Sequence, residues 1–275
     1  MKGFLIFLLA TRRYMAVLGL AVLAFFFIAA LAAPLLYSWS SATMVNLAHA
    51  LAPPSLAFPL GADEMGRSMV ARLVWGARVS LIVAGTSVSV ALVAGLLIGG
   101  LCGYYDNRIT FVTMRAMDAV ISFPRILVAI MLITILGPGM ASLTLAIAIS
   151  SVPVFARLFR GPVLSLKTRD FVLASRSLGA GDMRLLFRHV MPNISALIIV
   201  QGSISLAEAV LIASGLSFLG LGPQPPVPEW GAMIAQSRSH LMSSPHVVLV
   251  PGVALFLLVL ALNLVGDGLR DFTDP

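Results

Sequence analysis

The chain has little charge and almost no cysteine. Only 11% of its residues are charged, whereas 59% are hydrophobic and the mean hydropathy is +1.02. Ordinary soluble domains carry about 25% charged residues, so this composition excludes a soluble globular domain and indicates an integral membrane protein. The single cysteine, Cys102, excludes an intramolecular disulfide.

Several catalytic signatures are also missing. The chain has no phosphate-binding loop of the G-x-x-x-x-G-K-[ST] type, so we expect it not to hydrolyse ATP by itself. It has no nucleophile-elbow or zinc-protease pattern, and its histidines and carboxylates show no metal-ligand spacing. We therefore expect no catalytic residue, no metal site and no cofactor bound by this chain, and we favour transport over membrane enzymology.

The sequence does contain apolar runs long enough to span a bilayer, which takes roughly 20 residues. They predict six transmembrane helices within an all-α polytopic membrane protein, whose core domain covers 79–266. The third run is interrupted by Pro124 and Arg125, and the fifth contains Glu208. The expected spans are 15–37, 79–105, 119–137, 139–156, 194–217 and 247–266.

Basic residues are distributed unevenly between the segments that join these spans. If the N-terminus lies inside, fourteen of the 18 Lys and Arg residues fall on the inner side. Short loops rich in Lys and Arg stay cytoplasmic, so we predict that termini 1–14 and 267–275 and loop 157–193 are cytoplasmic. Segment 38–78 is then extracytoplasmic, and Arg125 is expected to snorkel to the inner headgroups. Orientation and anionic lipid explain the positive charge, without nucleic acid.

The N-terminal run has a second interpretation. Arg12 and Arg13, an apolar run and an Ala-x-Ala pattern ending at Ala32 are typical of a cleavable signal sequence. The run is longer than an ordinary signal core, and Pro34 follows the candidate cleavage site. We favour an uncleaved transmembrane helix.

The loop 157–193 predicts a helical knob beneath the membrane. From 169 to 178 a short helix is expected, in which Phe171, Ala174 and Leu178 fall at i, i+3 and i+7 and so lie on one side. Gly179 then breaks this helix, and Asp182 can cap a second one that ends at Pro192. An exposed apolar face needs a partner to cover it; alternatively, the helix lies in the lipid interface. The loop's seven basic residues are Arg157, Arg160, Lys167, Arg169, Arg176, Arg184 and Arg188.

The sequence of this loop resembles the EAA loop of ABC importer permeases, most closely in the peptide/nickel permease family. The resemblance rests on 170–180 (DFVLASRSLGA) and 189–193 (HVMPN). It continues in register from about residue 60 to the end of the chain. The further matching motifs are 60–63, 66–67, 76–81, 114–115, 118, 123–124, 136–139, 156–157, 216–222, 229–231 and 263–271.

This resemblance implies a type I ABC importer permease fold with a cytoplasmic coupling helix seated in a cleft of an ATPase. Leu173 stands where many relatives have the glutamate that names the motif. We therefore expect docking to depend on apolar contacts and neighbouring arginines. The residues assigned to ATPase coupling by this resemblance are Phe171, Ala174, Ser175, Arg176, Leu178, Gly179 and Pro192.

The resemblance also implies partners and a location. The partners are a second homologous permease subunit forming a heterodimer, two cytoplasmic ABC ATPases that bind the ATP, and an extracytoplasmic solute-binding protein. The location is the bacterial inner membrane. Di- or oligopeptides and nickel or a metal chelate both remain open as substrates, because some nickel-type members also read Leu-Ala-Ser at 173–175.

A polar face on the fifth span suggests where solute passes. Gln201, Ser205 and Glu208 have i, i+4 and i+7 spacing, which places them on one side of a helix. We hypothesise that they line the translocation route and that Glu208 meets a cationic group. The alternative is a structural hydrogen-bond stripe between helices. In the outer loop, Trp230 is interpreted as an interfacial anchor or a receptor contact.

An autonomous secondary transporter is the alternative function. Such carriers usually show internal repeats and helices broken near the midplane of the membrane. The sequence indicates neither, and six spans are few for a complete carrier. We therefore prefer the permease subunit.

Overall fold

The computed structural model describes residues 2–273, with side chains from Tyr14 to Phe272, and these residues form helices and no strand. The predicted termini 1–14 and 267–275 therefore lie partly outside the described residues. The helices of the described part are α1 (Lys2–Leu36), α2 (Trp39–Thr43), η1 (Leu47–His49), α3 (Met69–Tyr104), α4 (Arg108–Ile121), α5 (Arg125–Leu136), α6 (Met140–Leu166), α7 (Asp170–Ser177), α8 (Asp182–Arg184), η2 (Leu185–Val190), η3 (Met191–Ile194), α9 (Ser195–Phe218), α10 (Trp230–Ser237), η4 (Arg238–His240) and α11 (His246–Thr273).

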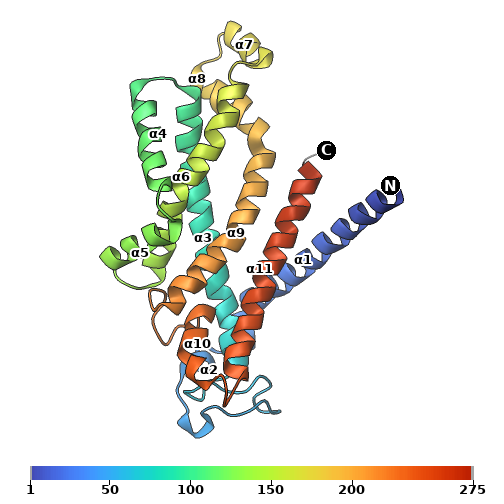
Figure 1. Ribbon diagram of the computed structural model, residues 1–275, viewed down its shortest axis with the longest axis vertical. Coiled ribbons are helices and arrows are strands. Elements are labelled where there is room, and N and C mark those ends of the chain that lie inside the picture. The colour runs from blue at the N-terminus through green and yellow to red at the C-terminus, as the bar shows by residue number, and fades with distance from the viewer. Residues whose placement is uncertain (1, 274–275) are drawn as a thin grey trace.

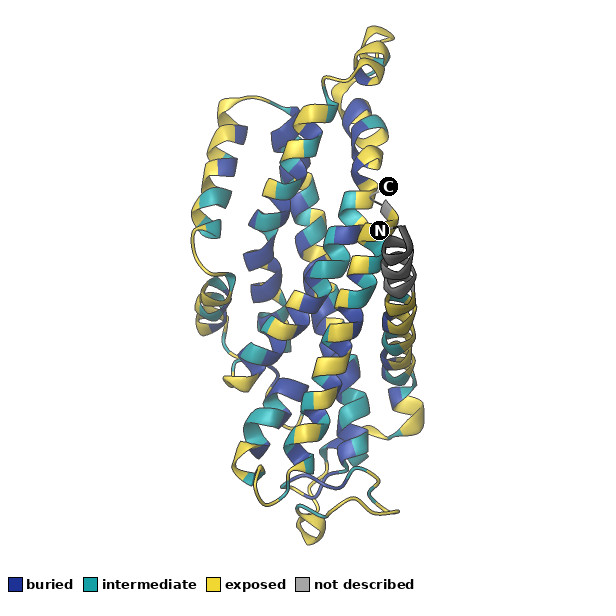
Figure 2. Cartoon of the chain, turned by 45° about the vertical axis from the view of Figure 1, so that its right-hand side comes forward, coloured by how far each residue is buried: buried dark blue, intermediate teal, exposed yellow. Residues whose placement is uncertain are grey.

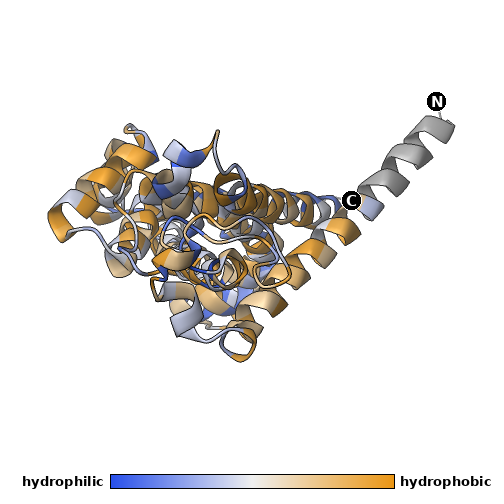
Figure 3. Ribbon diagram, turned by 90° about the horizontal axis from the view of Figure 1, so that it is seen from below, coloured by the Kyte–Doolittle hydropathy of each residue, from blue (hydrophilic) through white to orange (hydrophobic). Residues whose placement is uncertain are grey.

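The long helices form an elongated bundle. Within the described residues, five helices are long and apolar enough to cross a membrane, and the bent pair α4–α5 provides a sixth candidate. In Figure 1 the helix α7 lies at one end of the bundle, and α2 and α10 lie at the other. The helix α1 begins, and α11 ends, in the half of the molecule that contains α7. The view along the bundle in Figure 3 shows that hydrophobic residues dominate these helices.

Glycines bring the two longest central helices together. A side chain at Gly95 or Gly99 of α3 would collide with Phe155 or Ala156 of α6, and one at Gly103 would collide with Val163. Small residues at four-residue spacing let helix backbones approach closely in a membrane. The α3–α6 pair is therefore the most extensively packed part of the bundle.

The third expected span is broken. The range 119–137 crosses a 95° bend between α4 and α5, so it does not form one straight helix. Pro124 lacks a backbone N–H and disfavours helical geometry at Phe123, which explains why the helix stops there. The chain therefore contains a broken helix, although the sequence pattern indicated none.

Two helices extend beyond the apolar runs that predicted them. Helix α3 begins at Met69 rather than at 79, after Ser68 whose Oγ accepts from the N–H of Ala71. Helix α6 continues to Leu166 rather than ending at 156. Polar residues end an apolar run without ending a helix, so hydropathy alone underestimated both lengths.

The second helix of the loop was expected to end at Pro192, but it continues past this residue. The helical path runs on from Asp182 to Phe218 as one candidate span. It changes winding on the way, to a π turn at η2 and a 3₁₀ turn at η3. Such local rewinding accommodates a proline inside a membrane helix.

Candidate functional site

Six of the seven residues expected to couple to an ATPase lie on an exposed projection, which we call the α7 knob (residues 170–184). The seventh, Pro192, lies beyond it in η3. Figure 2 shows α7 almost entirely exposed at the end of the bundle. Phe171 is 42% exposed and Leu178 is 89% exposed, whereas Val172 between them is fully buried. Ala174 is exposed as well. The knob thus carries an apolar surface that nothing in the described chain covers.

The knob turns sharply at Gly179. This glycine has a φ of +86°, a left-handed conformation that costs other residues energy. Its N–H donates to the carbonyl of Arg176, and the N–H of Ala180 donates to that of Ser175. These two bonds form a Schellman motif, which satisfies the last carbonyls of α7. The motif glycine of the resemblance is therefore required by backbone geometry.

A polar network ties the knob to the bundle. The Tyr104 hydroxyl, at the end of α3, donates to Asp182 Oδ1 at 2.8 Å. Arg176 Nη2 donates to the Tyr104 oxygen at 2.7 Å and to Asp182 Oδ1 at 3.2 Å. The hydrogen bond to Tyr104 raises the pKa of the Arg176 guanidinium. Lys167 Nζ, just after α6, donates to the carbonyl of Tyr104.

Sequence reasoning missed most of this network. Asp182 is not the N-cap of its helix, which is Gly181. Its carboxylate is turned toward Tyr104 and Arg176 instead. Tyr104 was visible only as an aromatic residue at the end of an apolar run, and nothing local identified its partner 78 residues away.

The predicted polar stripe on the fifth span divides into two environments. Ser205 is buried in the bundle, and its Oγ receives a hydrogen bond from Gln201 Nε2 at 3.4 Å. Gln201 itself borders a groove of about 690 Å³ between α6 and α9, near Arg270. Glu208 is instead 48% exposed on the side of α9.

Glu208 forms an ion pair with Arg125. Arg125 Nη2 lies 2.8 Å from Glu208 Oε2, and the Arg125 side chain is 25% exposed. At a rise of about 1.5 Å per residue, Glu208 lies roughly 20 Å from the start of α9 and 15 Å from its end. Arg125 begins α5, beyond the bend. The expectation that Arg125 snorkels to inner headgroups is therefore wrong.

A second ion pair joins α4 to α6. Arg157 Nη1 lies 2.9 Å from Asp118 Oδ1, and both side chains are partly exposed. Arg157 was assigned to the cytoplasmic loop, but it lies inside α6, nine residues before its end. Arg125 and Arg157 were both assigned to the membrane surface, because their carboxylate partners are distant in sequence.

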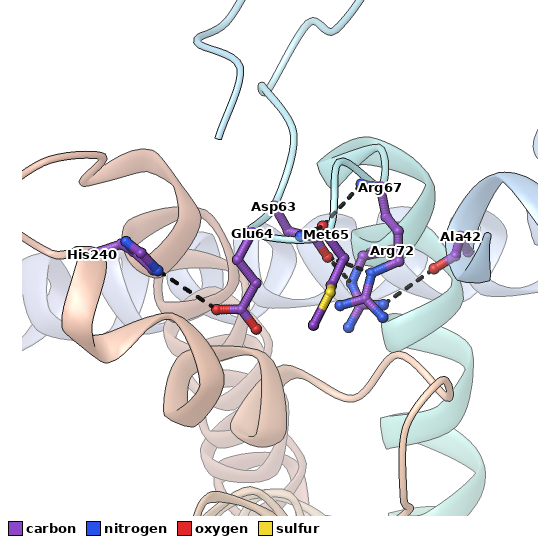
Figure 4. Close-up of polar contacts among 7 residues, drawn as sticks. All are labelled: Ala42, Asp63, Glu64, Met65, Arg67, Arg72 and His240. Atoms are coloured by element: carbon purple, nitrogen blue, oxygen red, sulfur yellow. Dashed lines mark hydrogen bonds and ion pairs between the residues drawn. The ribbon is translucent and has the colours of Figure 1, made fainter. Parts of the chain in front are cut away.

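At the opposite end of the bundle, a buried carboxylate holds two arginines (Figure 4). Asp63 Oδ2 lies 2.7 Å from Arg67 Nε and 3.2 Å from Arg72 Nε. Asp63 Oδ1 accepts from the backbone N–H groups of Met65 and Arg67. Arg72 also donates to the carbonyl of Ala42. Because these groups, which we call the Asp63 cluster, are buried and mutually paired, they fix loop 44–68 onto the start of α3.

A neighbouring contact connects the Asp63 cluster to another loop. Glu64 Oε2 lies 3.8 Å from His240 Nε2 of η4 (Figure 4). The loop before α3 and the turn η4 are thus joined at this end of the bundle. Two exposed apolar side chains, Leu56 and Met242, lie in these same loops.

Trp230 is neither an interfacial anchor nor a receptor contact in the described chain, because it is fully buried. Its Nε1–H donates to the carbonyl of Leu73, and its ring packs edge-on against Phe26. The preceding Glu229 caps α10 by accepting from the N–H of Ala232. Burial raises the pKa of the Glu229 carboxyl.

Comparison with known proteins agrees with this architecture. Residues 95–275 match the family model described as binding-protein-dependent transport system inner membrane component. Residues 11–54 match the N-terminal TM domain of oligopeptide transport permease C. A chain of the MetNI methionine ABC transporter, solved in inward-facing conformations, has a similar fold, with a TM-score of 0.61. That likeness covers 74% of this chain and 96% of that one, at 20% identity.

Curated relatives are similar over most of their length. The dipeptide transport system permease protein DppC of Alkalihalophilus pseudofirmus is 42% identical over 96% of this chain and 86% of its own. The di/tripeptide permease DppC of Pseudomonas aeruginosa is 46% identical over 82% of this chain and 76% of its own. The glutathione permease GsiD of Pectobacterium atrosepticum is 46% identical over 81% and 74%. The chain therefore belongs to the family of inner membrane permease components of binding-protein-dependent ABC transport systems.

Proposed function

We propose that this chain is a non-catalytic permease subunit that forms half of the translocation path of a peptide importer. A second homologous permease forms the other half, two cytoplasmic ATPases bind and hydrolyse the ATP, and a solute-binding protein delivers the peptide from outside. Both termini are then cytoplasmic. The observation that carries this proposal is the α7 knob, whose exposed apolar surface is tied to the ends of α3 and α6.

The chemistry of the knob suits docking onto another protein. Phe171, Leu173 and Leu178 expose apolar surface, and burying such surface stabilises an interface by about 25 cal/mol per Å². Leu173 replaces the usual glutamate, so apolar contacts carry the docking. Arg176 is held by Tyr104 and Asp182, which positions the surface before the partner arrives. A pre-positioned surface loses less conformational entropy on binding.

The opposite end of the bundle suits contact with a binding protein. The Asp63 cluster and the Glu64–His240 contact hold two outer loops in place. Leu56 and Met242 project from these loops and expose nearly all of their side chains. A rigid outer surface with a few exposed apolar residues is typical of a transient docking site.

The names of the relatives favour a peptide as the substrate. Two of them are named for dipeptide or di/tripeptide transport and one for transport of glutathione, itself a small peptide. Nickel or a metal chelate stays an untested alternative.

The test is uptake by proteoliposomes containing this chain, its partner permease and the two ATPase subunits. We expect uptake of a radiolabelled dipeptide only with internal ATP and the binding protein present. Replacing Leu178 by Asp in the α7 knob should lower uptake and peptide-stimulated ATP hydrolysis at least about tenfold, because a charge is placed in an apolar interface. Ser177→Ala is the control, since Ser177 Oγ donates to the carbonyl of Leu173 within its own helix. Uptake by this chain alone without nucleotide would refute the proposal.

A further inference from the structure

We propose that the Arg125–Glu208 ion pair is a substrate site within the translocation path, and that it receives small zwitterions carrying a free ammonium and a free carboxylate. The ammonium binds Glu208 while the carboxylate binds Arg125, so each side chain exchanges its present partner for one end of the solute. This inference rests on the proposed function, because it places the pair in a peptide path.

The depth of the pair supports this proposal. Glu208 lies near the middle of α9 and is the one charged residue of that helix, which forms part of a candidate span. Its side chain is 48% exposed and that of Arg125 is 25% exposed. Charges at such depth are rare and face a bundle interior or a water-filled cavity. An exposed ion pair therefore indicates that this side of α9 faces a path or a protein partner, and not lipid.

The orientation of α9 also supports the proposal. Ala207, Ala209 and Val210, on either side of Glu208, are buried against the bundle. Leu211 is exposed, and Gln201, seven residues before Glu208, borders the groove between α6 and α9. Positions three, four and seven residues apart share a helix face. Ile204, four residues before Glu208, lines the same groove, whereas Ser205, three residues before it, is buried. The groove therefore approaches Glu208 along the Ile204 side of this face.

The ion pair joins two separate helices, α5 and α9. Helix α5 packs mainly on α6, and the 95° bend separates it from α4. The side chains of Arg125 and Glu208 reach each other from α5 and α9 across 83 residues of sequence. Both side chains are long and flexible, so they can separate to admit a solute without unfolding either helix.

Charge balance then selects the solute. Without solute, Arg125 and Glu208 neutralise each other, so the path holds no unpaired charge at this level. A zwitterion replaces each partner with one of the same sign, whereas a solute with one blocked end leaves a charge unpaired in a poorly hydrated site. A chain of n residues spans at most about 3.5 Å per residue. Di- and tripeptides, whose termini are a few ångströms to roughly 10 Å apart, are the solutes able to bridge the separated pair.

The experiment uses the complete transporter in proteoliposomes, with the binding protein saturated by each probe. The probes are alanyl-alanine, its N-acetyl derivative and its C-terminal amide. The variants are Glu208→Gln, Arg125→Gln and the exchange of the two charges, Arg125→Glu with Glu208→Arg. Asp118→Asn is the control, since it breaks the comparable exposed ion pair with Arg157.

We expect each neutral variant to lower alanyl-alanine uptake at least tenfold, and the charge exchange to restore it to within threefold of wild type. Asp118→Asn should stay within twofold. In Glu208→Gln the preference for alanyl-alanine over its N-acetyl derivative should shrink at least fivefold relative to wild type; in Arg125→Gln the preference over the amide should shrink likewise. These ratios cancel the selectivity of the binding protein and any loss of assembled transporter.

Unchanged uptake and unchanged ratios in both neutral variants would overturn the inference. So would lowered uptake with unchanged ratios, because that pattern shows a purely structural ion pair. If the wild-type transporter moves no dipeptide with ATP and binding protein present, the proposed function fails instead, before any variant is compared.

Discussion

The hydroxyl of Tyr104 lies 2.8 Å from the carboxylate of Asp182, joining the end of α3 to the α7 knob. Arg176 contacts both groups. Tyr104, a residue of the bundle, is therefore the hydrogen-bonding partner that two residues of the α7 knob share. The position of the knob is therefore set by the bundle, as well as by its own short helices.

Replacing Tyr104 by Phe removes this connection while keeping the ring. The variant loses two hydrogen bonds, to Asp182 and from Arg176, at about 1 kcal/mol each, and about 2 kcal/mol shifts a two-state equilibrium roughly thirtyfold. We expect fewer peptides transported per ATP hydrolysed, measured in proteoliposomes. Tyr105→Phe is the control, because the Tyr105 hydroxyl reaches only Met183 Sδ at 4.0 Å. Equal coupling ratios in the two variants would show that the Tyr104 bond does not matter.

Replacing Gly179 by Ala tests the turn that shapes the knob. The φ of +86° is costly for an L residue, by roughly 1–2 kcal/mol. We expect faster proteolytic cleavage within residues 170–184 and weaker coupling. Gly161→Ala is matched to it, because Gly161 lies within α6 with open space around its Cα. Identical cleavage rates in both variants would contradict the need for glycine at 179.

Replacing Asp63 by Asn keeps acceptor atoms but removes the charge that compensates Arg67 and Arg72. Removing one partner of a buried ion pair costs about 3–5 kcal/mol. The melting temperature of the detergent-purified chain should therefore fall by several degrees. Glu64→Gln should change it much less, since its contact with His240 is longer and partly exposed, and such pairs contribute about 0–1 kcal/mol. A larger fall in melting temperature for Glu64→Gln than for Asp63→Asn would contradict the expectation that Asp63 is the more important residue for stability.

Glu229 should make the stability of the fold depend on pH. Burial raises the pKa of its carboxyl above 4.5 in the folded chain. As the pH rises above that value, the unfolded chain releases the proton first, so the folded state becomes less stable until its own pKa is passed. We expect the melting temperature to fall from about pH 4.5 toward neutral, and Glu229→Gln to flatten that slope. An equally steep slope in Glu229→Gln would assign it to other groups.

Local patterns were sufficient to predict the α7 knob. The spacing of Phe171 and Leu178 marked its exposed side, and Gly179 marked its end, because both signals depend on neighbours within one or two turns. The family and its fold were likewise predictable from motifs in sequence order, and the comparisons confirm them.

Interactions between distant segments were not predictable. Arg125 and Arg157 were assigned to the inner surface, because a charge count cannot recognise Glu208 or Asp118 as partners in the bundle. Trp230 suggested an interface because tryptophan often lies there, yet its burial depends on Gly76 of α3 leaving room for the ring. The environments of Arg125, Arg157 and Trp230 depend on which helix faces pack together, and a single sequence does not reveal that packing.

Helix α3 carries Arg72 of the Asp63 cluster near one end and Tyr104 at the other. It spans 36 residues without a break, or about 54 Å. Because α6 is seated against its glycines, α3 works as a stiff rod. Tilting that rod by about 10° about one end would displace the other by about 9 Å, given its length. Under the proposed function, a push delivered at the α7 knob therefore reaches the Asp63 end of α3 as a movement of the same rigid piece, with no hinge between to absorb it.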